Sequence, residues 1–440
     1  MYRLVYRLYR AYSSMRYWSR RRLTAGGWIV LVGLFLTGGM ATDTEQSMGY
    51  QIFALLLCFS VAAMAVAPFF RMKFSAERML PKFGSAGQPL RYRVSIRNHS
   101  GRAQTGLQVL DGLADPRPSF DDFLALTRPT KRRKSLRISG TPDVRRVRQI
   151  KSVVLPTLPP HGSADVEVEL VPLKRGVLHF ENVALARLDP FMLFRAFSSV
   201  KVPGAFTILP KRYPLPAIPL PGSQQYQHGG VALAAAIGES EEFVSLRDYR
   251  PGDPLRRIHW RSWAKAGRPV VKEFQDEFFV RHALILDTFT EPDDIAVFEE
   301  AVSVAASFAC TIDTQESLLD LLFVGPEAFC FTIGRGVAHA DQMMEILAAV
   351  NPSPDKPFAA LDQLVVEHAS SVSGCICIFL EWDEPRRHLI RKLTTLGVPV
   401  LVLVIRESGA PPIERTADDP ESLHVLETGN IEAALAKLYP

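Results

Sequence analysis

The chain of 440 residues contains only five cysteines, and none of them belongs to a Cys-x-x-Cys pair. Each lies in an apolar run, which is typical of buried free thiols in a reducing compartment and excludes a disulfide framework. Cys375 and Cys377 would share one face of a strand, so we interpret them as packing residues. The chain also lacks a G-x-x-x-x-G-K-[ST] loop and a G-x-G-x-x-G turn opening a helix, which argues against a nucleotide-phosphate site.

Acidic residues are absent before Asp43, and charged residues are absent from two apolar runs, 23–41 and 48–70. Each run has about the twenty residues that cross a hydrocarbon core, so we predict two transmembrane helices. The connection between the runs has no Lys or Arg, whereas Arg71 and Lys73 follow the second run directly. The positive-inside rule then places both termini and all soluble domains in the cytoplasm. We therefore expect an inner-membrane protein of bacterial type.

Residues 1–22 form a basic tail in which tyrosines alternate with arginines. This composition suits a segment that lies against anionic lipid headgroups, and it equally suits a solvated tail. Residues 19–23 and the first apolar run also resemble an export signal of secretory or twin-arginine type. Even then the second run would stop transfer with its basic flank inside, so the chain after residue 71 would still be cytoplasmic.

Short alternating segments fill residues 71–210, without a convincing helical period, and they predict a β-sandwich-like domain. The segment 89–98 is one such strand, and the turn residues at 99–102 predict a hairpin after it. Basic side chains gather in 115–151, which we interpret as a loop. Residues 128–151 are either a solvated basic ribbon or a site that binds anionic lipid or another polyanion. Nucleic acid is disfavoured because interleaved aromatic residues are missing.

Prolines are concentrated in residues 211–222, which favours an extended linker after the β-rich domain. The block 223–278 follows, and its second half interleaves aromatic and charged side chains tightly. Pro251 and Gly252 suit the centre of a type II turn, which the side chain of Asp253 can hold.

Apolar strands alternate with amphipathic helices throughout residues 279–440, which predicts a mostly parallel sheet covered on both faces. Strands are expected at 283–286, 318–324, 329–333, 375–380, 400–405 and 423–427. Helices are expected at 293–310, 340–350, 358–370, 385–396 and 430–438.

The block closely resembles the bacterial family catalogued as domain of unknown function 58, whose members share an E-F-x-x-L-R-x-Y-x-x-G-D-x-x-R-x-I-x-W-x-x-x-A-[RK] pattern. The matching residues are Glu242, Phe243, Leu246, Arg247, Tyr249, Gly252, Asp253, Arg256, Ile258, Trp260, Ala264 and Lys265. The paired apolar runs and the Asp189-Pro190-Phe191 step also look like the family, although His259 stands where many relatives have Asp. The resemblance implies that 279–440 is a von Willebrand factor A-like, Rossmann-like interaction domain.

Domains that resemble von Willebrand factor A often hold a metal ion above the first strand through a D-x-S-x-S motif. Here Asp287 is followed by T-F-T-E, and Phe289 offers no oxygen to Mg²⁺. We therefore expect no conventional metal site and no cofactor. Asp287, Thr288 and Asp383 are the candidates for a degenerate site, and Asp287 alternatively caps the turn after its strand.

The resemblance further implies association with a MoxR-type AAA+ ATPase, so we expect a non-enzymatic, membrane-anchored adaptor or scaffold. Trp260 and Trp263 either anchor a partner or hold the block to its own domain. One alternative is a hydrolase or metal-assisted enzyme at the sheet edge that uses Asp253, His259 and Asp287, although no nucleophile with supporting residues accompanies them. The other is polyanion or anionic-lipid binding through the basic loop.

Overall fold

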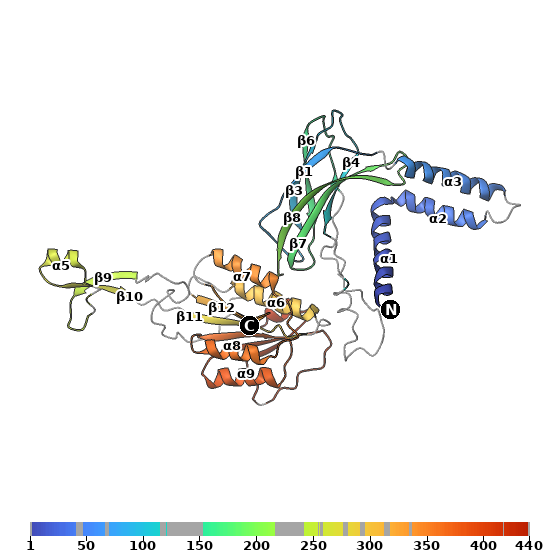
Figure 1. Cartoon of the computed structure of the whole chain (residues 1–440). Helices are drawn as coiled ribbons and strands as arrows, with labels where there is room; N and C mark the ends of the chain where they lie inside the picture. Colours follow the sequence, from blue (N-terminus) through green and yellow to red (C-terminus); the bar gives the residue numbers. More distant parts are fainter. Residues whose placement is uncertain are drawn as a thin grey trace. The chain divides into compact units, whose positions relative to one another are not determined.

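The structure is a computed structural model, and contacts between residues divide the chain into two compact units, Met1–Leu209 and Pro210–Pro440 (Figure 1). The residues that it describes are 2–40, 47–66, 70–114, 120, 153–215, 242–253, 255, 258–275, 280–290, 295–311, 317–333, 337–416 and 418–438. The predicted basic loop, apart from Phe120, and most of the predicted linker lie outside these ranges.

The first unit begins with three helices: α1 (Tyr2–Arg22), α2 (Ala25–Met40) and α3 (Ser47–Val66). Residues Met48–Val66 are long and apolar enough to cross a membrane, whereas Ala25–Gly39 form a shorter apolar helix. Among the described residues there is therefore one candidate span and one shorter apolar helix where the sequence predicts two spans. The basic tail, to which the sequence analysis assigns no structure, is helical.

Helices α2 and α3 lie side by side (Figure 1), and glycines allow their close approach. A Cβ atom added at Gly33 would lie 3.1 Å from the side chain of Leu56, and one at Gly38 would lie 3.3 Å from Phe53. Both distances are tighter than ordinary van der Waals contact. Small residues at such an interface are typical of packed helix pairs in membranes.

The rest of the first unit consists of two sheets. The first has the order β1 (Phe74–Met79), β3 (Leu90–Asn98), β6 (Ser163–Leu170). The second has the order β2 (Phe83–Ser85), β8 (Arg195–Leu209), β7 (Gly176–Leu188), β4 (Leu107–Leu113), β5 (Val153–Val154). Alternating residues of β3, such as Val94 and Ile96, are fully buried and share one core with Val109 of β4 and Leu185 of β7. The two sheets thus form a sandwich.

The predicted hairpin after β3 is wrong, because β3 pairs with β1 and β6 whereas β4 pairs with β7 and β5. The turn after Asn98 instead carries the chain from one sheet to the other. Residues 176–188 form one long strand, β7, with a bulge between Phe180 and Asn182. A turn signal in the sequence shows that the chain changes direction, not which sheet receives it.

A six-stranded mixed sheet forms the centre of the second unit, in the order β13-β12-β11-β14-β15-β16. The strands are β11 (Val280–Leu286), β12 (Ser317–Val324), β13 (Ala328–Ile333), β14 (Gly374–Phe379), β15 (Val400–Arg406) and β16 (Leu423–Glu427). All neighbours are parallel except the edge strand β13. This confirms the predicted mostly parallel sheet.

Helices cover both faces of this sheet, with α6 and α7 on one side and α8 and α9 on the other (Figure 1). The helices are α6 (Ile295–Thr311), α7 (Val337–Ala349), α8 (Ala359–Ala369), α9 (Glu384–Thr395) and α10 (Ile431–Leu435). Each predicted strand and helix of this region is present within a few residues of its expected bounds. Cys375 and Cys377 are buried in β14, and burial raises the pKa of the Cys375 thiol to about 12, so both act as packing residues.

Candidate functional site

The block that carries the family pattern folds as a hairpin. Strand β9 (Glu242–Asp248) pairs antiparallel with β10 (Val270–Gln275), and a short helix, α5 (Trp260–Ala266), lies in the connection. Ile258 forms a bridge to Val271, and both side chains are buried. The His259 N–H donates to the Val270 carbonyl at 2.9 Å. These contacts fold the connection back onto β10.

A tight turn at Arg250–Asp253 begins this connection. Gly252 has φ +106°, a conformation that side-chain-bearing residues rarely adopt, which explains the glycine. The Asp253 N–H donates to the Arg250 carbonyl at 3.1 Å, and the Asp253 carboxylate accepts from the Arg250 N–H at 2.8 Å. The turn predicted at Pro251-Gly252, held by the Asp253 side chain, is confirmed.

Asp253 also forms a bidentate ion pair with Arg247, whose two terminal nitrogens lie 2.7 and 2.8 Å from the carboxylate oxygens. The hydrogen bonds from Arg247, and then from the Arg250 backbone, lower the pKa of Asp253 to about 2. Asp253 is therefore ionised at neutral pH and holds the turn. His259 Nδ1 lies 2.7 Å from Ser262 Oγ, so in the described contacts Asp253 and His259 have separate partners.

Large apolar side chains are exposed on the hairpin. Trp260 and Trp263 stack with ring centroids 5.2 Å apart and an interplanar angle of 18°, and Trp260 is 63% exposed. Leu246 and Leu255 are also exposed. Gly267, in the left-handed conformation, ends α5 four residues after Trp263. The stacked pair thus presents an aromatic surface to solvent, which is typical of a protein-binding site.

The remaining residues of the pattern are structural, surface-exposed or not described. The Tyr249 N–H donates to the Pro269 carbonyl at 3.0 Å, and Lys265 is exposed in the last turn of α5. Glu242 and Phe243 belong to β9, but their side chains lie outside the described part of the chain. Arg256 lies outside the described residues entirely.

Asp287 lies at the carboxyl end of β11 and is fully buried. One carboxylate oxygen accepts from the Phe289 N–H at 3.0 Å, which is the predicted capping role. The other accepts from the Leu380 N–H at 3.2 Å and from two nitrogens of Arg386, each at 2.7 Å. The Asp287 charge is therefore matched inside the protein by a guanidinium.

Arg386 lies in the first turn of α9 and is 4% exposed. It also binds Asp383 at 2.7 Å, and its guanidinium lies 4.8 Å from the centre of the Phe358 ring. Burial disfavours the charged guanidinium, but the Asp287 carboxylate outweighs it and raises the pKa of Arg386. Arg386 is not among the site residues predicted from the sequence. A cation at a helix N-terminus, where the dipole disfavours it, is the signal that could have revealed a carboxylate partner.

The three candidates for a degenerate metal site therefore have other partners. Asp287 and Asp383 share Arg386, and the Thr288 hydroxyl donates to the Val324 carbonyl at 2.5 Å. The guanidinium takes the position in which a cation would neutralise Asp287. These residues consequently do not fit the metal ion that the von Willebrand factor A resemblance implies.

Known proteins match both regions. Residues 245–406, which include most of the hairpin and the sheet as far as β15, match the family described as "Protein of unknown function DUF58". The "Uncharacterized protein YeaD" of Bacillus subtilis (strain 168) is 25% identical over 201 residues, which cover 45% of this chain and 48% of the relative. The match thus spans about half the length of that curated relative.

Solved structures resemble this chain only weakly. A CARDB domain from Pyrococcus furiosus is 14% identical, with a TM-score of 0.16 over 30% of this chain and 95% of the other. A PapD-like domain of human CEP192 is 13% identical, with a TM-score of 0.18 over 31% and 87%. Scores this low support no conclusion about fold.

The hairpin and the sheet together make one class of domain, in which a turn-stabilised hairpin with an exposed Trp260 precedes a mixed α/β sheet. The chain carries a DUF58 family domain over residues 245–406, as the sequence pattern predicts.

Proposed function

We propose that this protein is a non-enzymatic, membrane-anchored adaptor whose hairpin binds a cytoplasmic protein. The stacked pair of Trp260 and Trp263 carries the proposal. Exposure of the large indole ring to water is unfavourable, and its burial in a protein interface is favourable. Tryptophan is enriched among the interface residues that contribute most to affinity. The bidentate pair of Arg247 and Asp253 holds the adjacent turn before any partner arrives, which reduces the entropy lost on binding.

Helices α2 and α3 supply the anchor in this proposal. Helix α3 is the candidate span, and α2, with 16 residues, is about 24 Å long against a hydrocarbon core of about 30 Å. Tilting, local thinning of the bilayer and flanking residues accommodate such a mismatch. The close packing at Gly33 and Gly38 supports a two-span membrane hairpin, and the flanking arginines favour cytoplasmic termini at the inner membrane.

The expected partner is a MoxR-type AAA+ ATPase. This partner class rests on the family resemblance, and the exposed aromatic surface of the hairpin supports a protein as the ligand. In the adaptor role, the chain would hold such an ATPase at the membrane.

Affinity capture of the full-length protein from detergent-solubilised bacterial membranes, with and without ATP, tests the partner. We expect the wild-type protein to recover an AAA+ ATPase and Trp260→Ala to recover about tenfold less, because central tryptophans contribute at least about 1.4 kcal/mol to such interfaces. Leu396→Ala, which truncates another exposed side chain of the same unit, is the matched control and should capture normally.

Two results would count against the proposal. If no ATPase is recovered with or without ATP, an AAA+ ATPase is excluded as the partner. Equal recovery by wild type and Trp260→Ala would retain the partner but exclude the tryptophan stack as its contact. Because Trp260 is exposed, its truncation should leave the thermal unfolding of the domain unchanged, and this is measured alongside.

A further inference from the structure

Helix α1 is amphipathic, and its apolar face is uncovered. Leu4, Leu8, Met15 and Trp18 follow one another at intervals of four, seven and three residues, which places them on one face of the helix. They are 64%, 62%, 73% and 47% exposed. Four large apolar side chains in a row thus face away from the rest of the described unit.

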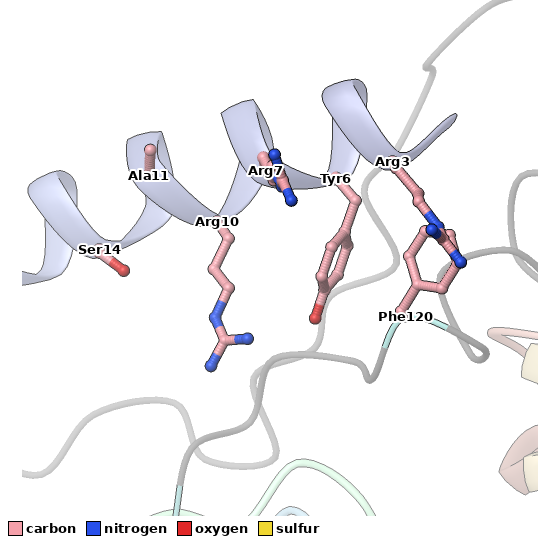
Figure 2. Close-up of a pocket in the computed structure, with 7 residues that line it drawn as sticks. All are labelled: Arg3, Tyr6, Arg7, Arg10, Ala11, Ser14 and Phe120. Carbon is pink, nitrogen blue, oxygen red and sulfur yellow. The ribbon is translucent and has the colours of Figure 1, made fainter. Parts of the chain in front are cut away.

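The helix is also strongly basic. It contains no Asp or Glu, and its arginines are Arg3, Arg7, Arg10, Arg16, Arg20, Arg21 and Arg22. Several of them lie on the opposite side to the apolar face, where Arg3, Tyr6 and Arg10 line a shallow groove together with Phe120 (Figure 2). The Arg3 guanidinium lies 5.8 Å from the centre of the Phe120 ring. A positive face and an apolar face therefore share one helix.

The end of α1 is fixed at the membrane hairpin. Leu23, directly after α1, is buried with Leu193, Phe194 and Ala63, the last of which lies near the end of α3. The Thr24 N–H donates to the Leu193 carbonyl at 3.1 Å and leads into α2. Helix α1 runs across the direction of α2 and α3 (Figure 1). If α2 and α3 cross a bilayer, α1 lies along its surface.

We propose that α1 is an interfacial helix that binds the anionic lipid surface of the cytoplasmic leaflet. The face of Leu4, Leu8, Met15 and Trp18 is buried at the boundary of the acyl chains, and the arginines bind the phosphate groups of the lipids. Charge complementarity and the junction with α2 and α3 identify the bilayer as the occupant of the apolar face. The inference rests on the proposed membrane anchorage and is independent of the proposed ATPase partner.

Photocrosslinking identifies what covers the apolar face. The full-length protein is reconstituted into vesicles of phosphatidylglycerol and phosphatidylcholine, with p-benzoylphenylalanine at the position of Leu8 or, as the matched control, of Tyr6 on the groove side. We expect several-fold more lipid adduct from the Leu8 position. Resistance to alkaline extraction is measured first in each variant, so that a failure of anchorage by α2 and α3 is distinguished from a failure of the α1 contact.

A second variant tests the charge. Replacing Arg3, Arg7 and Arg10 by Gln should reduce the lipid adduct from the Leu8 position several-fold in phosphatidylglycerol-rich vesicles, while alkaline extraction is unchanged. Adducts at Leu8 with protein only, whether a second copy or another chain, would overturn the proposal, as would equal lipid labelling from both positions. Equal labelling in vesicles of phosphatidylcholine alone would overturn the role of the anionic headgroups.

Discussion

Two arginine–aspartate pairs of the second unit have the same chemistry and different surroundings. The side chains of Arg247 and Asp253, in the hairpin, are 34% and 15% exposed. Those of Arg386 and Asp287, at the sheet edge, are 5% and 0% exposed. Water and salt screen the first pair, whereas the second must offset the desolvation of both charges through short, well-directed contacts.

The two pairs therefore stabilise different parts of the second unit. The partly buried pair in the hairpin fixes the turn that precedes the tryptophan stack, so its loss should change the geometry of the hairpin with little effect on the sheet. The buried pair joins the end of β11 to the first turn of α9, residues that are 99 positions apart in sequence. Its loss should therefore reduce the stability of the sheet itself.

The largest expected effect comes from breaking the buried pair. Arg386→Ala leaves Asp287 charged and buried without its partner, and we expect a loss of about 3–5 kcal/mol in the unfolding free energy of the α/β sheet. Hydrogen-exchange mass spectrometry of the full-length protein measures this loss in peptides from β11, β14 and α9, without assuming that both units unfold together.

Arg391→Ala is the matched control for Arg386→Ala. Arg391 also lies in α9 and pairs with Glu384, but the two side chains are 45% and 70% exposed. We expect a change below about 1 kcal/mol, as is usual for exposed ion pairs. If the two variants lost equal protection, the Arg386–Asp287 contact would not be a buried ion pair in solution.

An intermediate effect is expected at Asp383, which both caps α9 and binds Arg386. Its side chain accepts from the Arg386 N–H at 3.3 Å and from the guanidinium at 2.7 Å. Asp383→Ala should cost about 0.5–2 kcal/mol, whereas Asp383→Asn retains the capping acceptor and should cost less. The same exchange measurement on α9 decides this, and equal losses in both variants would show that the charge, and not the cap, is what matters.

The local pattern of apolar and polar residues predicts the α/β sheet well, because each of its strands and helices has its own periodicity and is bounded by turn residues. It failed where the structure depends on distant partners. The turn at 99–102 is present, but the hydrophobic pattern of β3 suits either sheet, so the sequence could not show that the chain crosses between them. Strand β8 (Arg195–Leu209) also lacks a clear local signal, because Lys201, Pro203 and Gly204 interrupt its apolar alternation.

In the candidate sites, too, features made by neighbouring residues could be predicted and contacts between distant residues could not. The turn at Pro251-Gly252 could be predicted because its residues are adjacent and each has a known conformational preference. The motif alone also shows that Phe289 offers no oxygen at a position where the D-x-S-x-S motif has a serine. The position of Arg386 at a helix N-terminus points to a carboxylate partner, but nothing in the sequence shows that this partner is Asp287, which lies 99 residues earlier.

The smallest expected effect concerns the pH dependence of the Arg247–Asp253 pair in the hairpin. Hydrogen bonds from Arg247 and Arg250 lower the pKa of Asp253 from 3.8 to about 2, so the turn should be fully held above pH 3.8 and released as the pH falls through about 2. Arg247→Gln removes the largest cause of the shift, so release should move upward toward pH 3.8. The Arg250 amide resonance in ¹⁵N-arginine-labelled protein, assigned by its loss in Arg250→Lys, reports the hydrogen bond to Asp253 directly. A midpoint that is the same with and without Arg247 would mean that the backbone bond from Arg250, and not the ion pair, holds this carboxylate ionised.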